Sequence, residues 1–154
     1  VVSIPNGIEL GSGVDATAAN TLDDYEEGTW TPVITPETQS AASITVNIAQ
    51  YTKIGRLVSL VFQVTINSIS GTTNTRAIEL TGMPFTVNSG ATGGGPNIGY
   101  QNLQNSMTGS LALQGNSTTL YRIVNLDGAT GLNASDHLQS NSILRGQFTY
   151  HTDQ

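Results

Sequence analysis

The chain has 154 residues, enough for one domain with a sizeable hydrophobic core. Only 10% of them are charged, and eleven acidic against five scattered basic residues give a net charge of −6, which argues against nucleic-acid binding and against a basic helix at a membrane surface. The absence of cysteine excludes disulfides, thiol nucleophiles and cysteine metal ligands, and no apolar run is long enough for membrane insertion.

Residues 1–21 are predicted to be a stalk or linker segment. Single apolar residues alternate there with proline and glycine. Residues 15–20 could form no more than a helical turn. The chain begins without Met and without a basic leader, so we interpret it as the C-terminal piece of a longer protein. The domain organisation that we expect is therefore a stalk-like segment at 1–21 and a β-rich tip domain at 22–154.

Residues 22–32 hold four of the eleven acidic residues and the only tryptophan. A helix is disfavoured there, because its C-terminal end, which is the negative end of the helix dipole, would carry Asp23, Asp24, Glu26 and Glu27. A turn or entry loop is therefore predicted. Clustered carboxylates suit calcium, but the run lacks the alternating oxygen-ligand spacing with a central glycine that calcium loops show. Whether the run at 23–27 binds a cation stays open, and a solvated turn is the simpler interpretation.

Trp30 comes next, directly before Thr31 and Pro32. Its flat apolar face could stack on a sugar ring, which makes it a candidate ligand-binding residue. At the start of a strand, however, a tryptophan also anchors the edge of a core. Both interpretations are open from the sequence.

From Trp30 onward the dominant period is two. The most regular stretch is at 58–66, where five apolar residues share one side of a predicted strand: Val58, Leu60, Phe62, Val64 and Ile66. Further strands are predicted at 44–48, around 78–80, at 111–113, at 120–124 and at 143–151, with turn signals between them. Short strands at this spacing indicate an all-β fold, which we expect to be an antiparallel, jelly-roll-like β-sandwich.

Residues 87–105 are predicted to be the longest loop. Tyr100 with Asn97, Gln101 and Asn102 would offer one stacking face and several amide donors and acceptors, which is sugar-binding chemistry. The alternative is a surface loop that packs Ile98 and Tyr100 inward. The candidate ligand-binding set is therefore Tyr100, Asn97, Gln101, Asn102 and Trp30.

The sequence gives little support for a catalytic site. Ser135, Asp136 and His137 are adjacent in sequence, but a triad is defined by spatial geometry, which adjacency does not supply. The two histidines, His137 and His151, lack zinc spacing, and acidic residues such as Glu79 and Asp127 are more simply turn or surface residues. No catalytic residue, metal ligand or cofactor is expected.

The order of four segments resembles the C-terminal domains of bacteriophage tail fibres and tailspikes. These segments are Leu-Asp-Asp-Tyr-Glu-Glu-Gly-Thr-Trp-Thr-Pro at 22–32, Tyr-Thr-Lys-Ile-Gly-Arg-Leu-Val at 51–58, Gly-Met-Pro-Phe at 82–85 and Phe-Thr-Tyr at 148–150. The resemblance implies a β-sandwich tip that forms a homotrimer at the end of a fibre, in the extracellular tail of a virion. It also implies binding to a host surface glycan, lipopolysaccharide or other receptor.

The resemblance leaves two alternatives to a receptor-binding tip. One is a purely structural trimerisation domain or folding clamp without a ligand. The other is a polysaccharide-degrading enzyme, but the chain lacks the repetitive β-helix that carries the hydrolase site in tailspike enzymes. Any depolymerase activity would then reside upstream of these residues.

Overall fold

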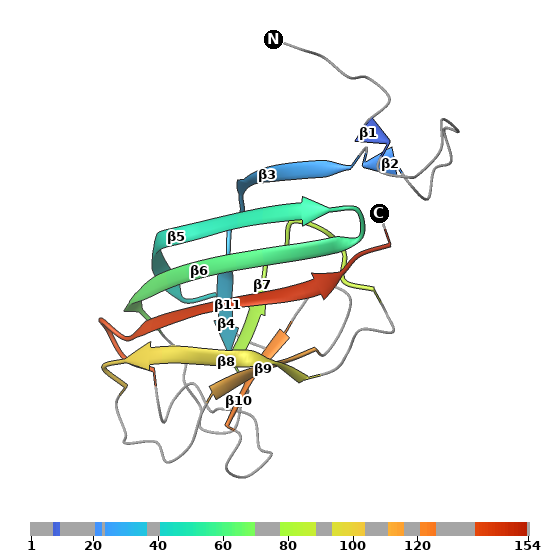
Figure 1. The fold of residues 1–154 in the computed structure, drawn as a ribbon. Coiled ribbons are helices and arrows are strands. Elements are labelled where there is room, and N and C mark those ends of the chain that lie inside the picture. Colours follow the sequence, from blue (N-terminus) through green and yellow to red (C-terminus); the bar gives the residue numbers. More distant parts are fainter. Residues whose placement is uncertain are drawn as a thin grey trace.

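The computed structural model describes residues 8–9, 21–22, 24–36, 41–69, 78–88, 94–103, 111–115, 121–125 and 138–153. Within these ranges every regular element is a β-strand, and every pair of neighbouring strands is antiparallel (Figure 1). The predicted all-β, antiparallel fold class is confirmed. The described part of the chain has no helix that is long and apolar enough to cross a membrane.

Two short strands near the N-terminus, β1 (Ile8–Glu9) and β2 (Thr21–Leu22), pair only with each other. The other described strands form one sheet in the order β3-β5-β6-β11-β8-β9-β10-β7-β4. Their bounds are β3 Tyr25–Thr29, β4 Val33–Pro36, β5 Ser43–Ile54, β6 Leu57–Ser68, β7 Ile78–Thr81, β8 Gly94–Gln101, β9 Leu111–Gly115, β10 Tyr121–Asn125 and β11 Ile143–His151. Because β8 pairs with both β11 and β9, the strands are joined in one continuous ladder.

The sheet folds back on itself. β3 and β4 are the two ends of the strand order, yet only residues 30–32 connect them. Such a link spans at most roughly 14 Å, whereas the ends of a flat sheet of this size would lie roughly 38 Å apart. Figure 1 shows the result, in which β4 and β7 cross the layer of β5, β6 and β11 instead of extending it.

The core lies between the two halves of the folded sheet. The five apolar residues predicted for one side of β6 are buried, which confirms the assignment of this strand to the core. Ile34 of β4 and Ile78 and Leu80 of β7 are also fully buried, in the same hydrophobic cluster. Phe62 lies at the centre of an aromatic chain, edge-on to Trp30 at 6.2 Å and to Phe148 at 6.4 Å between ring centroids.

Two sequence-based expectations are wrong. Within the acidic run at 23–27, residues 25–27 belong to a strand rather than a turn, because residues 25–29 pair in regular register with residues 50–54 of β5. Residues 94–101, expected within a loop, form β8 between β11 and β9. In both segments long-range pairing overrides a composition of Glu, Gly and Pro that disfavours strands.

Several predictions fall on residues outside the described ranges. These are most of the stalk segment at 1–21, the helical turn at 15–20 and the Ser135, Asp136 and His137 group. The division at residue 22 stays a prediction.

Candidate functional site

The side of the sheet that faces away from the core is here called the outer face. Because side chains alternate along a strand, every second residue of β3, β6, β11 and the part of β5 after its register shift at Val46/Ile48 belongs to it. The strand register aligns these residues in rows across the four strands. Two neighbouring rows are Glu27, Thr52, Ser59 and Thr149, and Thr29, Gln50, Val61 and Gln147.

The two rows line a shallow depression, here called the outer groove. One part, of about 410 Å³, is lined by Glu27, Gly28, Thr29, Gln50, Tyr51 and Thr52. A second part, of about 270 Å³, shares Gln50, Tyr51 and Thr52 and extends over Ser59, Leu60, Val61 and Gln147. The groove therefore runs across strands, from the edge strand β3 to β11.

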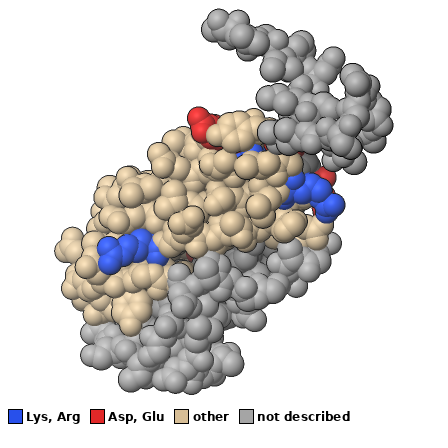
Figure 2. Space-filling model, viewed as in Figure 1, with Lys and Arg blue, Asp and Glu red and all other residues tan. Residues whose placement is uncertain are grey.

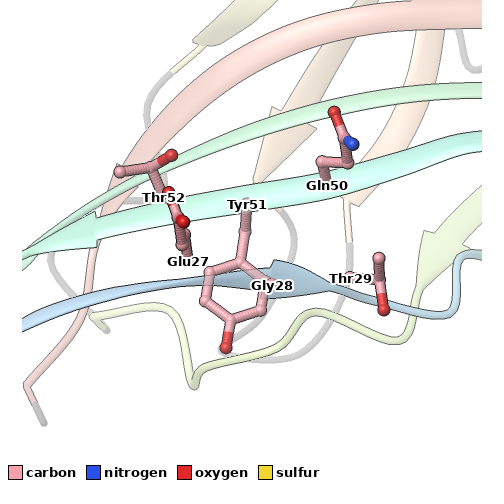
Figure 3. A pocket seen from close by; sticks show the side chains of 6 residues that line it. All are labelled: Glu27, Gly28, Thr29, Gln50, Tyr51 and Thr52. Atoms are coloured by element: carbon pink, nitrogen blue, oxygen red, sulfur yellow. The ribbon is translucent and has the colours of Figure 1, made fainter.

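Tyr51, which lines both parts of the groove, points its side chain away from the outer face (Figure 3). Figure 3 shows the Tyr51 ring pointing to the opposite side of the strand from the Gln50 and Thr52 side chains. On that side Tyr51 contacts Phe85 edge-on, with 5.3 Å between ring centroids. Its ring also packs against Gly28, where an added Cβ would lie 2.9 Å from Tyr51 Cε1. Gly28 thus lets the Tyr51 ring lie beneath β3 and hold this edge strand in place.

Amides and hydroxyls dominate the wall of the groove. Gln50 and Gln147 are exposed, and Thr52 and Ser59 are half-buried. Within the described part of the chain, no hydrogen bond or ion pair engages these four side chains. They can therefore donate to and accept from a ligand without giving up a bond inside the protein.

The carboxylates of the acidic run are distributed over both sides of β3. On the outer face Glu27 accepts a hydrogen bond of 2.8 Å from the Tyr25 hydroxyl, and this bond raises the pKa of Tyr25. On the inner side Asp24 pairs with the buried ammonium of Lys53. The described residues contain no group of three or more His, Cys, Asp or Glu that could hold a metal ion.

Trp30 lies in the core, not in the groove. It is 7% exposed, packs against Phe62, and donates its indole N–H to the Val61 carbonyl oxygen at 3.4 Å. This burial contradicts a sugar-stacking role for Trp30 and matches the alternative of an anchor at the core edge.

Tyr100 and Gln101, two of the other predicted ligand residues, face opposite sides of β8. Tyr100 is half-buried against the core opposite Leu144, whereas Gln101 is exposed opposite Ile143, on the other side of β8. Asn97 pairs with Ala112, and its side chain lies outside the described part.

Asn102 has a structural role. Its backbone is left-handed, with φ of 56°. Its carbonyl oxygen accepts hydrogen bonds from the Ser142 hydroxyl at 2.8 Å and from the Gln139 amide at 3.1 Å. Asn102 therefore holds the turn after β8 against the segment that leads into β11.

The groove residues Gln50, Thr52 and Gln147 were not among the sequence-based candidates. The period-two pattern indicates that polar residues alternate with the core positions of these strands. It does not give the register that aligns them across β3, β5, β6 and β11.

No protein-family model matches this chain, and no curated protein matches it.

Proposed function

We propose that this chain is the C-terminal tip domain of a phage tail fibre or tailspike, which assembles as a homotrimer and binds a host surface polysaccharide through the outer groove. The observation that carries the proposal is the row of uncommitted amides and hydroxyls, including Gln50, Thr52, Ser59 and Gln147, along one open groove. The order of the four sequence segments supports the tail-fibre assignment.

The shape of the groove favours a polymer over a small molecule. Pockets for small ligands enclose most of the ligand surface, whereas this groove is shallow and open across several strands. Its side chains offer both donors and acceptors, which matches the hydroxyls of a sugar chain. A stiff sheet also presents these groups in fixed positions, so little ordering is required on binding.

A binding titration tests the proposal. The chain of residues 1–154 is titrated calorimetrically with host surface polysaccharide fragments. Gln50→Ala combined with Gln147→Ala is expected to weaken binding about tenfold, since each substitution removes one or two hydrogen bonds. Gln101→Ala is the matched control, because it removes an exposed amide from the same sheet outside the groove lining. Equal affinity of wild type and double variant would contradict a role of the groove.

A second observation concerns assembly. Three large apolar residues that neighbour one another in register are exposed on the outer face: Tyr25 at 54%, Ile54 at 50% and Leu57 at 43%. A cluster of this kind favours association with other chains. It supports the homotrimer, and it also supports the second candidate function, a trimerisation domain without a ligand.

Light scattering tests assembly. The proposal predicts a particle of three times the chain mass of 16.1 kDa, and replacing Ile54 and Leu57 by Ser is expected to shift it toward monomer. A monomer at all concentrations would contradict both candidate functions. A trimer that binds no glycan would favour the trimerisation domain.

A further inference from the structure

Arg145 is a cation without a carboxylate partner in the described part of the chain. The other two basic side chains described are both paired, Lys53 with Asp24 and Arg56 with Asp153. Arg145 is exposed on β11, on the outer face. Figure 2 shows the surroundings, a broad face without charge over β5, β6 and β11, with basic groups set apart near its ends.

Gly99 supports the Arg145 side chain. The two residues are Cα partners on β8 and β11, and a Cβ at position 99 would lie 3.2 Å from both Cγ and Nε of Arg145. The aliphatic part of Arg145 therefore lies across the space that the missing side chain leaves. This contact holds the guanidinium over β8 instead of leaving it free to sweep through solvent.

Two amide residues neighbour Arg145 on the outer face. Gln63 is the Cα partner of Arg145 on β6, and Gln147 lies two residues along β11 on the same face, roughly 7 Å away. Gln147 also lines the outer groove, so the groove ends one outer-face position from Arg145 along β11. No described hydrogen bond or ion pair engages the side chains of Gln63 and Gln147.

We propose that Arg145, with Gln63 and Gln147, forms a subsite for an anionic sugar residue at the β11 end of the outer groove, an inference that rests on the proposed function. The planar guanidinium binds a carboxylate or a sulfate through two parallel hydrogen bonds, and the amides reach the neighbouring hydroxyls. Glu27 lies at the opposite end of the groove, so an acidic polymer binds with its charge at the Arg145 end.

The test compares oligomers of galacturonic acid, their neutral methyl esters and a sulfated oligosaccharide of equal length, by calorimetry on the full chain at low salt. The acidic oligomer is expected to bind about tenfold more tightly than its ester, and Arg145→Gln is expected to remove this difference. Arg56→Gln is the matched control, because it makes the same charge change at the β5–β6 turn. Gly99→Ala, which displaces the guanidinium without removing it, is expected to give an intermediate loss and an unchanged melting temperature.

The other outcomes decide between the Arg145 subsite and its alternatives. Binding of only the sulfated oligomer, lost in Arg145→Gln, would support the subsite with sulfate as the anion. Equal affinities for acidic and neutral oligomers would overturn the subsite and leave the proposed function standing. Binding of none of these oligosaccharides would overturn the subsite, and the titration with host polysaccharide fragments would still decide the proposed function. A change of oligomeric state in Arg145→Gln, with saccharide binding unchanged, would assign Arg145 to a contact between copies and overturn the subsite.

Discussion

Replacing Gly82 with alanine is expected to destabilise the fold by about 3 kcal/mol or more. Gly82 follows β7 with φ of 84°, a conformation that side chains with a Cβ rarely adopt. A Cβ at this position would lie 2.1 Å from the carbonyl oxygen of Thr31. This atom belongs to the backbone, so the added methyl group cannot be accommodated by a rotamer change.

The clash lies where the fold closes. Thr31 belongs to the short link between β3 and β4, and Val33 pairs with Thr81 directly before Gly82. Moving the link away from Gly82 would therefore disturb the pairing of β4 with β7 and the contact between the two ends of the sheet. The loss is expected in urea unfolding, as a lower midpoint with an unchanged slope.

Gly55 provides a matched control. It has a similar positive φ, 54°, in the turn between β5 and β6, but nothing lies within 4 Å of an added Cβ. Gly55→Ala should therefore reduce the free energy of unfolding only by the cost of holding a residue with a Cβ at positive φ, about 1 kcal/mol. Equal losses for Gly55→Ala and Gly82→Ala would show that the close approach at Thr31 contributes nothing.

Removing the carboxylate of Asp24 is the second large effect that we expect. Lys53 is 3% exposed, and its ammonium pairs with Asp24 while lying 5.4 Å from the centroid of the Phe85 ring. In Asp24→Ala this buried ammonium loses its counter-charge. Breaking fully buried pairs costs ~3–5 kcal/mol, and because the Asp24 side chain is 38% exposed we expect a smaller loss, about 2 kcal/mol.

A second substitution separates the lost pair from a general loss of packing. In Asp24→Ala combined with Lys53→Met, no unpaired charge remains and an apolar chain of similar length lies beside Phe85. The double variant should recover most of the lost stability, measured as the free energy of unfolding. If the loss of stability in the double variant equalled the sum of the losses in Asp24→Ala and Lys53→Met, an energetic role of the pair would be contradicted.

The strands that the sequence predicted correctly are those with a local signal. At β6 five apolar residues alternate without interruption, and at β11 the predicted range 143–151 agrees with the strand Ile143–His151. β3 and β8 carry no such signal, because Glu26, Glu27 and the glycines of β8 have low strand propensity. Their strands exist because β5, β11 and β9 supply hydrogen-bonding partners that are distant in sequence.

The residues of the candidate site also depend on contacts between segments that are distant in sequence. Trp30 and Tyr100 were recognised as aromatic groups suited to sugar, but whether an aromatic ring faces solvent depends on the fold around it. Both pack on the core. The residues of the outer groove are ordinary Gln, Thr and Ser in the sequence, and only the register between four strands brings them together.

The most direct test of the central claim is amide chemical-shift mapping of the isotope-labelled chain during titration with a bound polysaccharide fragment. If the polysaccharide binds in the outer groove, the largest shifts will occur at Gln50, Thr52, Ser59 and Gln147, and Tyr100 and Asn102 will shift little. Largest shifts at residues 97–102, with the groove unchanged, would contradict binding in the outer groove.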